Sequence, residues 1–237
     1  MKRGLLAEWI ADGVWRLQGN PGRLNVYFLE DGDGVVQFDA GGRCMLELVR
    51  AAAAQIGPLT EVVLGHAHTD HRGTAPFLGV PVCCHGDEVE DAEGSGGWRY
   101  WGDLGSMDRP RRMLHKHLLH PRYWDGGPVA IERTLAPGDT VAGFEVVHVP
   151  GHAPGLIALV RHSDGVALTS DLFYTVDQWC NDTAPRLPDA DWNDDTALAR
   201  ESLARFAAID VSVAWPGHGD PVRGDVRGQL RAAAAAA

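Results

Sequence analysis

The chain has 237 residues, 45% hydrophobic and 22% charged, and this composition excludes a disordered chain, a collagen and a disulfide scaffold. The 21 basic and 32 acidic residues give a net charge of -11, which disfavours nucleic acid and anionic membranes as partners. Glu8 and Asp12 interrupt the first apolar stretch before it could form a signal-peptide core, and no later apolar run reaches membrane-spanning length. These features indicate a soluble cytoplasmic protein.

The first forty residues alternate apolar and polar side chains in short runs, which predicts a β-meander. The runs cover residues 14–17, 24–29 and 35–38, and turn-forming residues separate them. Apolar residues then recur at helical spacing between two glycine-containing breaks, at Leu46, Val49, Ala53 and Ile56. The sequence therefore predicts one amphipathic helix at this point, followed by a strand at 61–64.

A second strand-rich block occupies the C-terminal half, with strands predicted at 144–149, 156–160, 166–169 and 211–215. The last strand follows a helix that carries Leu198, Ser202, Phe206 and Ile209 on one face, with Asp194 and Asp195 at its positive end. Both halves run from strands to a helix and then to a short strand that ends in a histidine-containing turn. We therefore expect an α/β protein in which two sheets pack together with helices outside, as a single domain over residues 1–237.

Residues 86–128 interrupt this repeat and form an aromatic-rich insertion. They contain a glycine-rich stretch at 94–97, aromatic residues at 98–101 and 123–124, and one expected amphipathic helix that includes residues 113–118. Long aromatic-rich insertions are often lids over a site, but a packed surface excursion explains the same composition. Both interpretations remain open from the sequence.

Cysteine and histidine carry different information in this chain. The cysteines, Cys44, Cys83, Cys84 and Cys180, show no C-x-x-C spacing, and we interpret them as buried, reduced thiols. Five of the 11 histidines, in contrast, fall in three short motifs. The search for a functional site therefore begins with histidine.

The strongest motif lies at residues 66–71, directly after the predicted strand at 61–64. It reads His66-Ala67-His68-Thr69-Asp70-His71. Imidazole nitrogens and carboxylates bind borderline divalent metals, and a turn after a strand lets closely spaced side chains converge on one ion. Three histidines at fixed offsets with an aspartate are rare by chance, so this motif predicts a metal site.

Three further turns complete the set, and each follows a predicted strand. They contain His152 within Pro150–Gly155, Asp171 after Thr169 and Ser170, and His218 within Pro216–Gly219. Open sheets present ligands at the carboxyl ends of their strands, and glycines beside His152 and His218 permit a close approach to a metal. We therefore expect these side chains to join the motif at 66–71.

In these motifs and their order, the chain resembles the metallo-β-lactamase-fold hydrolase superfamily, in its lactonase or glyoxalase II-like branch. The resemblance implies an α/β four-layer αββα sandwich. It also implies a first metal ion held by His66, His68 and His152 and a second held by Asp70, His71 and His218. Asp171 would bridge the two ions.

The resemblance further implies the chemistry of a hydrolase that acts on a small molecule. Two divalent ions, zinc by expectation with iron or manganese as alternatives, would share a hydroxide that attacks an ester, lactone or thioester carbonyl. Asp70 would orient the hydroxide and relay its proton, which makes this residue catalytic as well as metal-ligating. The metal charge would also offset the acidic surface for an anionic substrate.

Asp171 argues against a true β-lactamase, because the resemblance predicts cysteine or serine at this ligand position in that branch. A carboxylate suits thioesterases, lactonases, phosphodiesterases and a branch of mononuclear iron persulfide dioxygenases, and the ligand motif does not separate these activities. Tyr174 lies three residues beyond Asp171. In lactonase-like members a tyrosine so placed donates a hydrogen bond to the substrate carbonyl, which makes Tyr174 a candidate catalytic residue; a half-buried packing aromatic is the alternative.

Overall fold

The computed structural model describes residues 5–20, 22–94, 109–114 and 123–236. Its larger sheet has seven strands in sequential order, and the first four form the antiparallel meander that the N-terminal alternation predicts. Strands β5 to β7 then continue the sheet in parallel. The strands are β1 (Glu8–Ala11), β2 (Val14–Gly19), β3 (Leu24–Asp31), β4 (Gly34–Phe38), β5 (Leu59–Val63), β6 (Val82–His85) and β7 (Arg133–Leu135).

The second sheet has six strands in the order β15-β14-β11-β10-β9-β8. Strands β11 and β14 pair in parallel, and the helix between them makes that crossover. A separate two-stranded hairpin follows β11. The strands of the six-stranded sheet are β8 (Thr140–Val141), β9 (Phe144–His148), β10 (Ile157–Arg161), β11 (Val166–Ser170), β14 (Val213–Pro216) and β15 (Val222–Arg223), and the hairpin consists of β12 (Tyr174–Val176) and β13 (Asp182–Arg186).

Helices and single 3-10 turns connect the strands. Helix α1 (Leu46–Ile56) follows the turn η1 (Arg43–Met45), and helix α6 (Thr196–Phe206) begins at Asp195, whose side chain accepts a hydrogen bond from Leu198 N at 2.9 Å. The remaining elements are α2 (Thr69–Arg72), η2 (Ala75–Phe77), η3 (Gly86–Glu88), α3 (Val89–Glu93), α4 (Arg109–Leu114), η7 (Ala190–Trp192) and α7 (Val226–Ala236).

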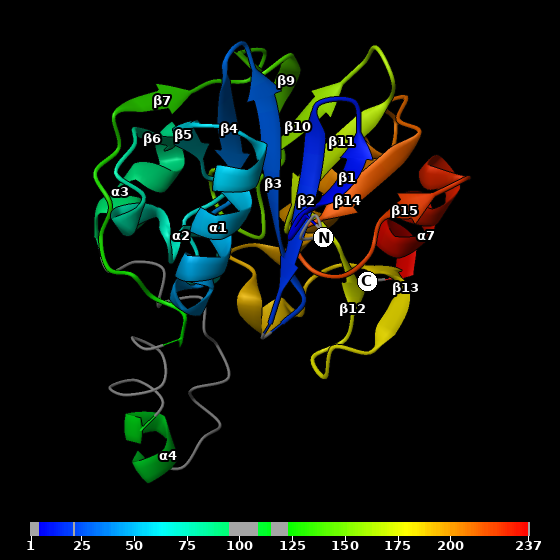
Figure 1. The fold of residues 1–237 in the computed structure, drawn as a ribbon. Coiled ribbons are helices and arrows are strands. Elements are labelled where there is room, and N and C mark those ends of the chain that lie inside the picture. The colour runs from blue at the N-terminus through cyan, green and yellow to red at the C-terminus, as the bar shows by residue number, and fades with distance from the viewer. Residues whose placement is uncertain (1–4, 21, 95–108, 115–122, 237) are drawn as a thin grey trace.

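The buried apolar side chains show four layers. One cluster joins the facing sides of the two sheets, with Tyr27 and Phe38 from the first sheet and Phe144 and Trp215 from the second. A second cluster packs α1 against the first sheet, and a third packs α6 and α7 against the second. Figure 1 shows α1 and α7 on opposite sides of the two sheets. The expected αββα sandwich is confirmed, because each sheet buries one face on the other and its second face under helices.

Several expectations about elements need correction. The edge strand β1, the parallel strands β6 and β7 and the hairpin β12–β13 were not expected from the sequence. Cys83 and Cys84 are buried on β6 as expected, but Cys44 is exposed and Cys180 is half-buried, so the interpretation of all four cysteines as buried thiols is wrong. Cys44 lies in the short turn η1 directly before α1, and Cys180 lies in the loop of the β12–β13 hairpin; connecting segments of this kind run along the surface.

The segment 86–128 is attached to the sandwich at both of its described ends. Its start forms η3 and α3, and the guanidinium of the fully buried Arg72 donates to the backbone carbonyls of Asp91, Ala92 and Gly94 at the end of α3. Arg72 also reaches Asp125 at 3.4 Å. The expected helix at 113–118 is seen as α4 up to Leu114, and residues 95–108 and 115–122 lie outside the described part of the chain.

No helix in the described part of the chain is long and apolar enough to cross a membrane.

Candidate metal centre

The motif at 66–71 forms a tight loop after β5. Residues 64–68 leave the strand, and α2 begins directly after His68, whose carbonyl accepts hydrogen bonds from His71 N at 2.9 Å and Arg72 N at 3.0 Å. The loop is anchored at Gly65, whose N–H donates to Asp39 Oδ1 at 2.8 Å. Because the candidate ligands of this motif follow one another within a single loop, their side chains lie together at the end of β5.

The other predicted residues lie in loops of the second sheet. His152 follows β9, Asp171 follows β11 and His218 follows β14, so all three lie after strand ends as the sequence predicts. Gly151, before His152, has a φ of 132°, which L side chains rarely adopt. Gly217, before His218, approaches Asp171 so closely that a Cβ would collide with its carboxylate. These two turns require glycine for the close approach.

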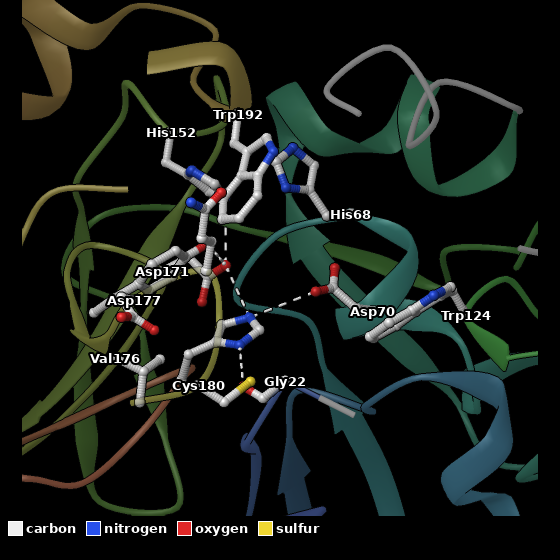
Figure 2. A pocket seen from close by; sticks show the side chains of 13 residues that line it. Gly22, His68, Asp70, Trp124, His152, Asp171, Val176, Asp177, Cys180 and Trp192 are labelled. Atoms are coloured by element: carbon white, nitrogen blue, oxygen red, sulfur yellow. Dashed lines mark hydrogen bonds and ion pairs between the residues drawn. The ribbon is translucent and has the colours of Figure 1, made fainter. Parts of the chain in front are cut away.

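The structure brings six of the seven predicted metal-ligating residues together in two groups, and Asp171, the seventh, lies between them. One group contains His66, His68 and His152, and a second contains Asp70, His71 and His218; in each, potential ligand atoms lie within 4.8 Å of one another. Figure 2 shows His68 and His152 facing each other across the top of the pocket, with Asp70 on its wall. The two groups contain the same residues that the resemblance assigns to two metal ions.

Asp171 lies between the two groups. Its Oδ2 atom is 3.4 Å from Nε2 of His152 and 3.7 Å from Nε2 of His66, both in the first group. The same oxygen is 3.2 Å from Nε2 of His71 and 3.6 Å from Nε2 of His218, both in the second. One carboxylate oxygen therefore faces histidines of both groups.

Hydrogen bonds on the far side of the rings set the histidine tautomers in the first group. Ser170 Oγ donates to Asp39 Oδ2 at 2.7 Å, so at 3.1 Å it can only accept the Nδ1 proton of His66. Nδ1 of His152 lies 3.0 Å from the amide oxygen of Asn193, which also only accepts. Both rings therefore carry their proton on Nδ1 and point the Nε2 lone pair at the other group members.

In the second group, too, a hydrogen-bond acceptor contacts Nδ1 of each histidine. Nδ1 of His71 lies 3.0 Å from Asp39 Oδ2, and Nδ1 of His218 lies 2.8 Å from the backbone carbonyl of Gly22. Both acceptors lack a hydrogen, so these rings also direct Nε2 inward. Metal-bound histidines in proteins show this arrangement, in which an acceptor holds the second ring nitrogen.

Buried polar atoms without a hydrogen bond test whether a metal ion fits. Within the described residues, Nε2 of His66, Nε2 of His152 and Oδ1 of Asp171 are buried and have no hydrogen-bond partner. Such atoms are costly to bury unless a ligand satisfies them. The two histidine nitrogens belong to one cluster of potential ligand atoms, and unsatisfied lone pairs clustered in this way fit a divalent metal ion.

Burial and neighbouring charges shift the pKa values of the ligand side chains in different directions in the two groups. Burial lowers the pKa of His66 and His68 well below the usual 6.5, so both imidazoles are neutral at pH 7. Burial alone would raise the pKa of Asp70, but the charge of His71 and a hydrogen bond from His218 outweigh it and lower this pKa to about 2. Burial would also lower the pKa of His71 and His218, but the charge of Asp171 outweighs it and raises both, which favours a second proton on these imidazoles that a metal ion must displace.

Asp39 connects the elements of the centre, and sequence reasoning missed it. This fully buried carboxylate at the end of β4 accepts from Gly65 N and Ser170 Oγ and contacts Nδ1 of His71. Asp39 and Ser170 both have positive φ, at 59° and 45°, and such strained backbone persists at sites where the surroundings enforce it. The only signal in the sequence is a single acidic residue after an apolar strand, which is common.

Tyr174 lies at the centre but does not point freely into the pocket. Its hydroxyl donates to Asp171 Oδ2 at 2.8 Å, the oxygen that faces both groups. Burial and the charge of Asp171 raise its pKa well above 10, so the hydroxyl stays protonated. The side chain is 5% exposed, so it is buried rather than half-buried, and it is a hydrogen-bond donor to the carboxylate in this structure.

A pocket of about 310 Å³ opens beside the two groups. Trp124 from the 86–128 segment and Trp192 from η7 form part of its wall, and Figure 2 shows them on different sides of it. Trp98 and Trp101, the other tryptophans of the 86–128 segment, lie outside the described residues. The lining residues are Gly22, His68, Asp70, Trp124, His152, Asp171, Tyr174, Val176, Asp177, Gln178, Cys180, Trp192 and His218.

Comparisons with solved structures show the same fold in other proteins. The metallo-beta-lactamase family protein TTHA1429 from Thermus thermophilus matches 95% of this chain and 79% of its own, with a TM-score of 0.69 and 24% identity. TTHA1623, solved in a di-iron-bound form, matches 92% of this chain and 97% of its own, with a TM-score of 0.61 and 23% identity.

Curated relatives carry the names of hydrolases. The probable metallo-hydrolase YqjP of Bacillus subtilis (strain 168) is 23% identical over 227 residues, which are 83% of this chain and 67% of that protein. The N-acyl homoserine lactonase AiiB of Rhizobium rhizogenes is 34% identical over 124 residues, which are 49% of this chain and 41% of the lactonase. Both names agree with the expectation, drawn from Asp171, of a hydrolase other than a true β-lactamase.

A family model matches most of the chain, including the candidate metal centre. The model described as the metallo-beta-lactamase superfamily matches residues 19–218, a range that begins in β2, ends at His218 and contains both metal-ligand groups. The chain therefore belongs to the metallo-beta-lactamase superfamily of metal-dependent hydrolases.

Proposed function

We propose that the protein is a dinuclear metal-dependent hydrolase that acts on the ester, lactone or thioester carbonyl of a small-molecule substrate. One observation supports this proposal most directly: Asp171 Oδ2 lies within 3.7 Å of Nε2 atoms from both ligand groups. A carboxylate oxygen shared in this way is the arrangement expected between two neighbouring dications.

The ligand roles follow from the two groups. His66, His68 and His152 would hold the first ion, Asp70, His71 and His218 the second, and Asp171 would contact both. Three imidazole ligands suit zinc, which is the metal we propose, while iron and manganese also accept this donor set. Two bound divalent ions would supply a water with a pKa near neutrality and would polarise a substrate carbonyl.

Asp70 combines binding with orientation of the nucleophile. Its carboxylate lines the pocket, and its Oδ2 lies 3.5 Å from Nε2 of His218. With a pKa of about 2 it is ionised at neutral pH and accepts hydrogen bonds. We therefore assign to Asp70 the orientation of the attacking water and acceptance of its hydrogen bond during the reaction.

Tyr174 is the proposed donor to the substrate. Its neutral hydroxyl borders the pocket and donates to Asp171 in this structure. A rotation of the O–H bond would redirect the proton toward a carbonyl oxygen beside the metal groups, where negative charge develops in the transition state. The role is the one that the resemblance to lactonases implies.

The pocket wall and the relatives favour a carbonyl substrate with an apolar part. Trp124, Val176 and Trp192 present apolar surface next to the ligand groups. Two N-acyl homoserine lactonases are 32% and 34% identical to about half of this chain. A lactone or ester with an apolar substituent is the substrate class that we propose.

Metal analysis combined with a substrate panel tests this function. Purified protein is analysed by elemental mass spectrometry and assayed with a lactone, an aryl ester and a thioester. Two metal ions per chain and hydrolysis of at least one substrate are expected. One iron per chain with oxygen consumption on a glutathione persulfide would overturn the proposal in favour of a persulfide dioxygenase, and hydrolysis of only a phosphodiester would assign that activity instead.

A further inference from the structure

Glu88 is a buried carboxylate outside the two ligand groups. It ends η3 and precedes α3, and its side chain is fully buried. Carboxylates are rarely buried completely, because removal from water costs several kcal/mol unless hydrogen bonds compensate for it. The position of Glu88 therefore depends on the groups that its two oxygens contact.

Each oxygen of Glu88 binds a different loop of the metal centre. Oε2 accepts from Ala67 N at 2.7 Å, and Ala67 is the residue between His66 and His68. Oε1 accepts from Gly155 N at 2.7 Å, and Gly155 ends the turn that contains His152. One carboxylate thus connects the two loops that carry all three histidines of the first group.

These two loops come from different sheets. The loop with His66 and His68 follows β5 of the larger sheet, whereas the turn with His152 joins β9 and β10 of the smaller one. Their relative position depends on contacts that cross between the sheets, and two charge-assisted hydrogen bonds of 2.7 Å are strong contacts of this kind.

The Glu88 side chain packs closely against the backbone of Gly155. A Cβ at this position would lie 2.7 Å from Cγ of Glu88, a distance that real Cβ atoms do not show. The glycine therefore leaves room for the Glu88 side chain, and its φ is not positive, so the backbone itself would accept alanine. The space at Gly155 is occupied by the Glu88 side chain and by its backbone nitrogen, which would lie 3.0 Å from the same Cβ.

We propose that Glu88 is a positioning residue for the first metal site, which sets the separation of His152 from His66 and His68. The inference rests on the proposed function, because it requires that this group holds a metal ion. Because Glu88 lies between η3 and α3, the proposal also means that the start of the 86–128 segment helps to position the residues of the metal centre. Glu88 is not among the residues that line the pocket, so this role involves no contact with the substrate.

The substitution Glu88→Gln tests the proposal with little change in size. A glutamine offers one acceptor oxygen, and its NH₂ group would face one of the two backbone N–H donors. The affinity of the first site for Zn²⁺ is expected to fall about 10- to 100-fold, the usual effect of losing a group that orients metal ligands. The histidines of the second site are oriented by Asp39 and by the carbonyl of Gly22 instead, so that site should keep its affinity.

The two sites are studied separately in two variants, each of which keeps only one ligand group intact. Competition with a chelator then measures the Zn²⁺ affinity of the remaining site. His218→Ala retains the first group alone, and there Glu88→Gln should weaken Zn²⁺ binding. His68→Ala retains the second group alone, and there Glu88→Gln should have no effect. Glu90→Gln, the same chemical change at an exposed position of α3, is the matched control and should leave both affinities unchanged.

Gly155→Ala is the second variant, and it decides the question if Glu88→Gln does not fold. The added methyl group should displace the Glu88 side chain and weaken the first site alone. Equal loss at both sites, or wild-type affinity in both folded variants, would overturn the inference. A wild-type protein that binds no Zn²⁺ would instead refute the proposed function, so the two failures are distinguishable.

Discussion

The substitution Asp39→Asn is the most informative perturbation of the centre outside the ligands. The Asp39 carboxylate lies 2.8 Å from Gly65 N, 2.7 Å from Ser170 Oγ and 3.0 Å from Nδ1 of His71. Asparagine has almost the same shape but only one acceptor oxygen. If that oxygen keeps Gly65 N, the NH₂ group faces Ser170 and His71, which both need an acceptor.

The magnitude follows from the lost contacts. The hydrogen bond to His71 involves a carboxylate, and such bonds contribute about 1.5–3 kcal/mol. Without that acceptor the His71 ring can move its proton to Nε2, which removes the lone pair directed at the second group. A tenfold change in affinity corresponds to about 1.4 kcal/mol, so a loss of metal affinity of about 10- to 100-fold is expected.

Chelator competition with Zn²⁺ measures this loss, and thermal unfolding of the metal-free protein monitors the scaffold. Asp33→Asn, in the exposed turn between β3 and β4, is the matched control. The second site should lose more affinity than the first, because His71 contacts Asp39 directly whereas His66 contacts it through Ser170. Asp39→Asn protein that binds both ions as tightly as wild type would refute this reasoning.

Four further outcomes are expected. Asp171→Ala should leave one metal ion per chain by elemental mass spectrometry, because repulsion between two dications without a shared carboxylate costs several kcal/mol even at an effective dielectric near 20; two retained ions would show that Asp171 does not bridge. Tyr174→Phe should lower kcat on carbonyl substrates about 100-fold with unchanged KM and metal content, and full kcat would leave the tyrosine a packing role beside Asp171. Chelation should abolish activity and lower Tm, because a ligand that binds only the folded state stabilises it, and equal Tm values with and without metal would contradict a preformed centre. Burial raises the pKa of Cys83 to about 12 and that of Cys84 further, so a thiol reagent at pH 8 should modify Cys44 in the folded protein but these two only after unfolding; rapid loss of all thiols would contradict their burial.

Local sequence patterns were sufficient to predict which candidate ligands lie close together. His66, His68, Asp70 and His71 lie within one turn after a strand, so their spacing along the chain reflects their spacing in space. His152, Asp171 and His218 each follow an apolar strand, and strand ends of packed sheets converge on one edge. The helices α1 and α6 were predictable for the same reason, because apolar periodicity and an N-terminal aspartate are local signals.

The residues that hold the ligands could not be predicted in this way. Asp39, Glu88 and Asn193 act on histidines or histidine loops that are distant in sequence or belong to another sheet. Nothing in their neighbouring residues distinguishes them from other acidic or amide residues. The resemblance likewise placed Tyr174 toward a substrate, whereas the structure shows its hydroxyl on Asp171.

The sequence by itself determined which residues can bind metal and which strands deliver them, because those properties depend on side-chain chemistry and short-range periodicity. Only the tertiary structure decided which acceptor contacts Nδ1 of His66, His71, His152 and His218 and how far apart the two sheets hold their loops. Both depend on single acceptors such as Asp39 Oδ2 and the Glu88 carboxylate, brought into contact by packing between segments that are remote in the chain. Those contacts exist only after the two sheets have packed together.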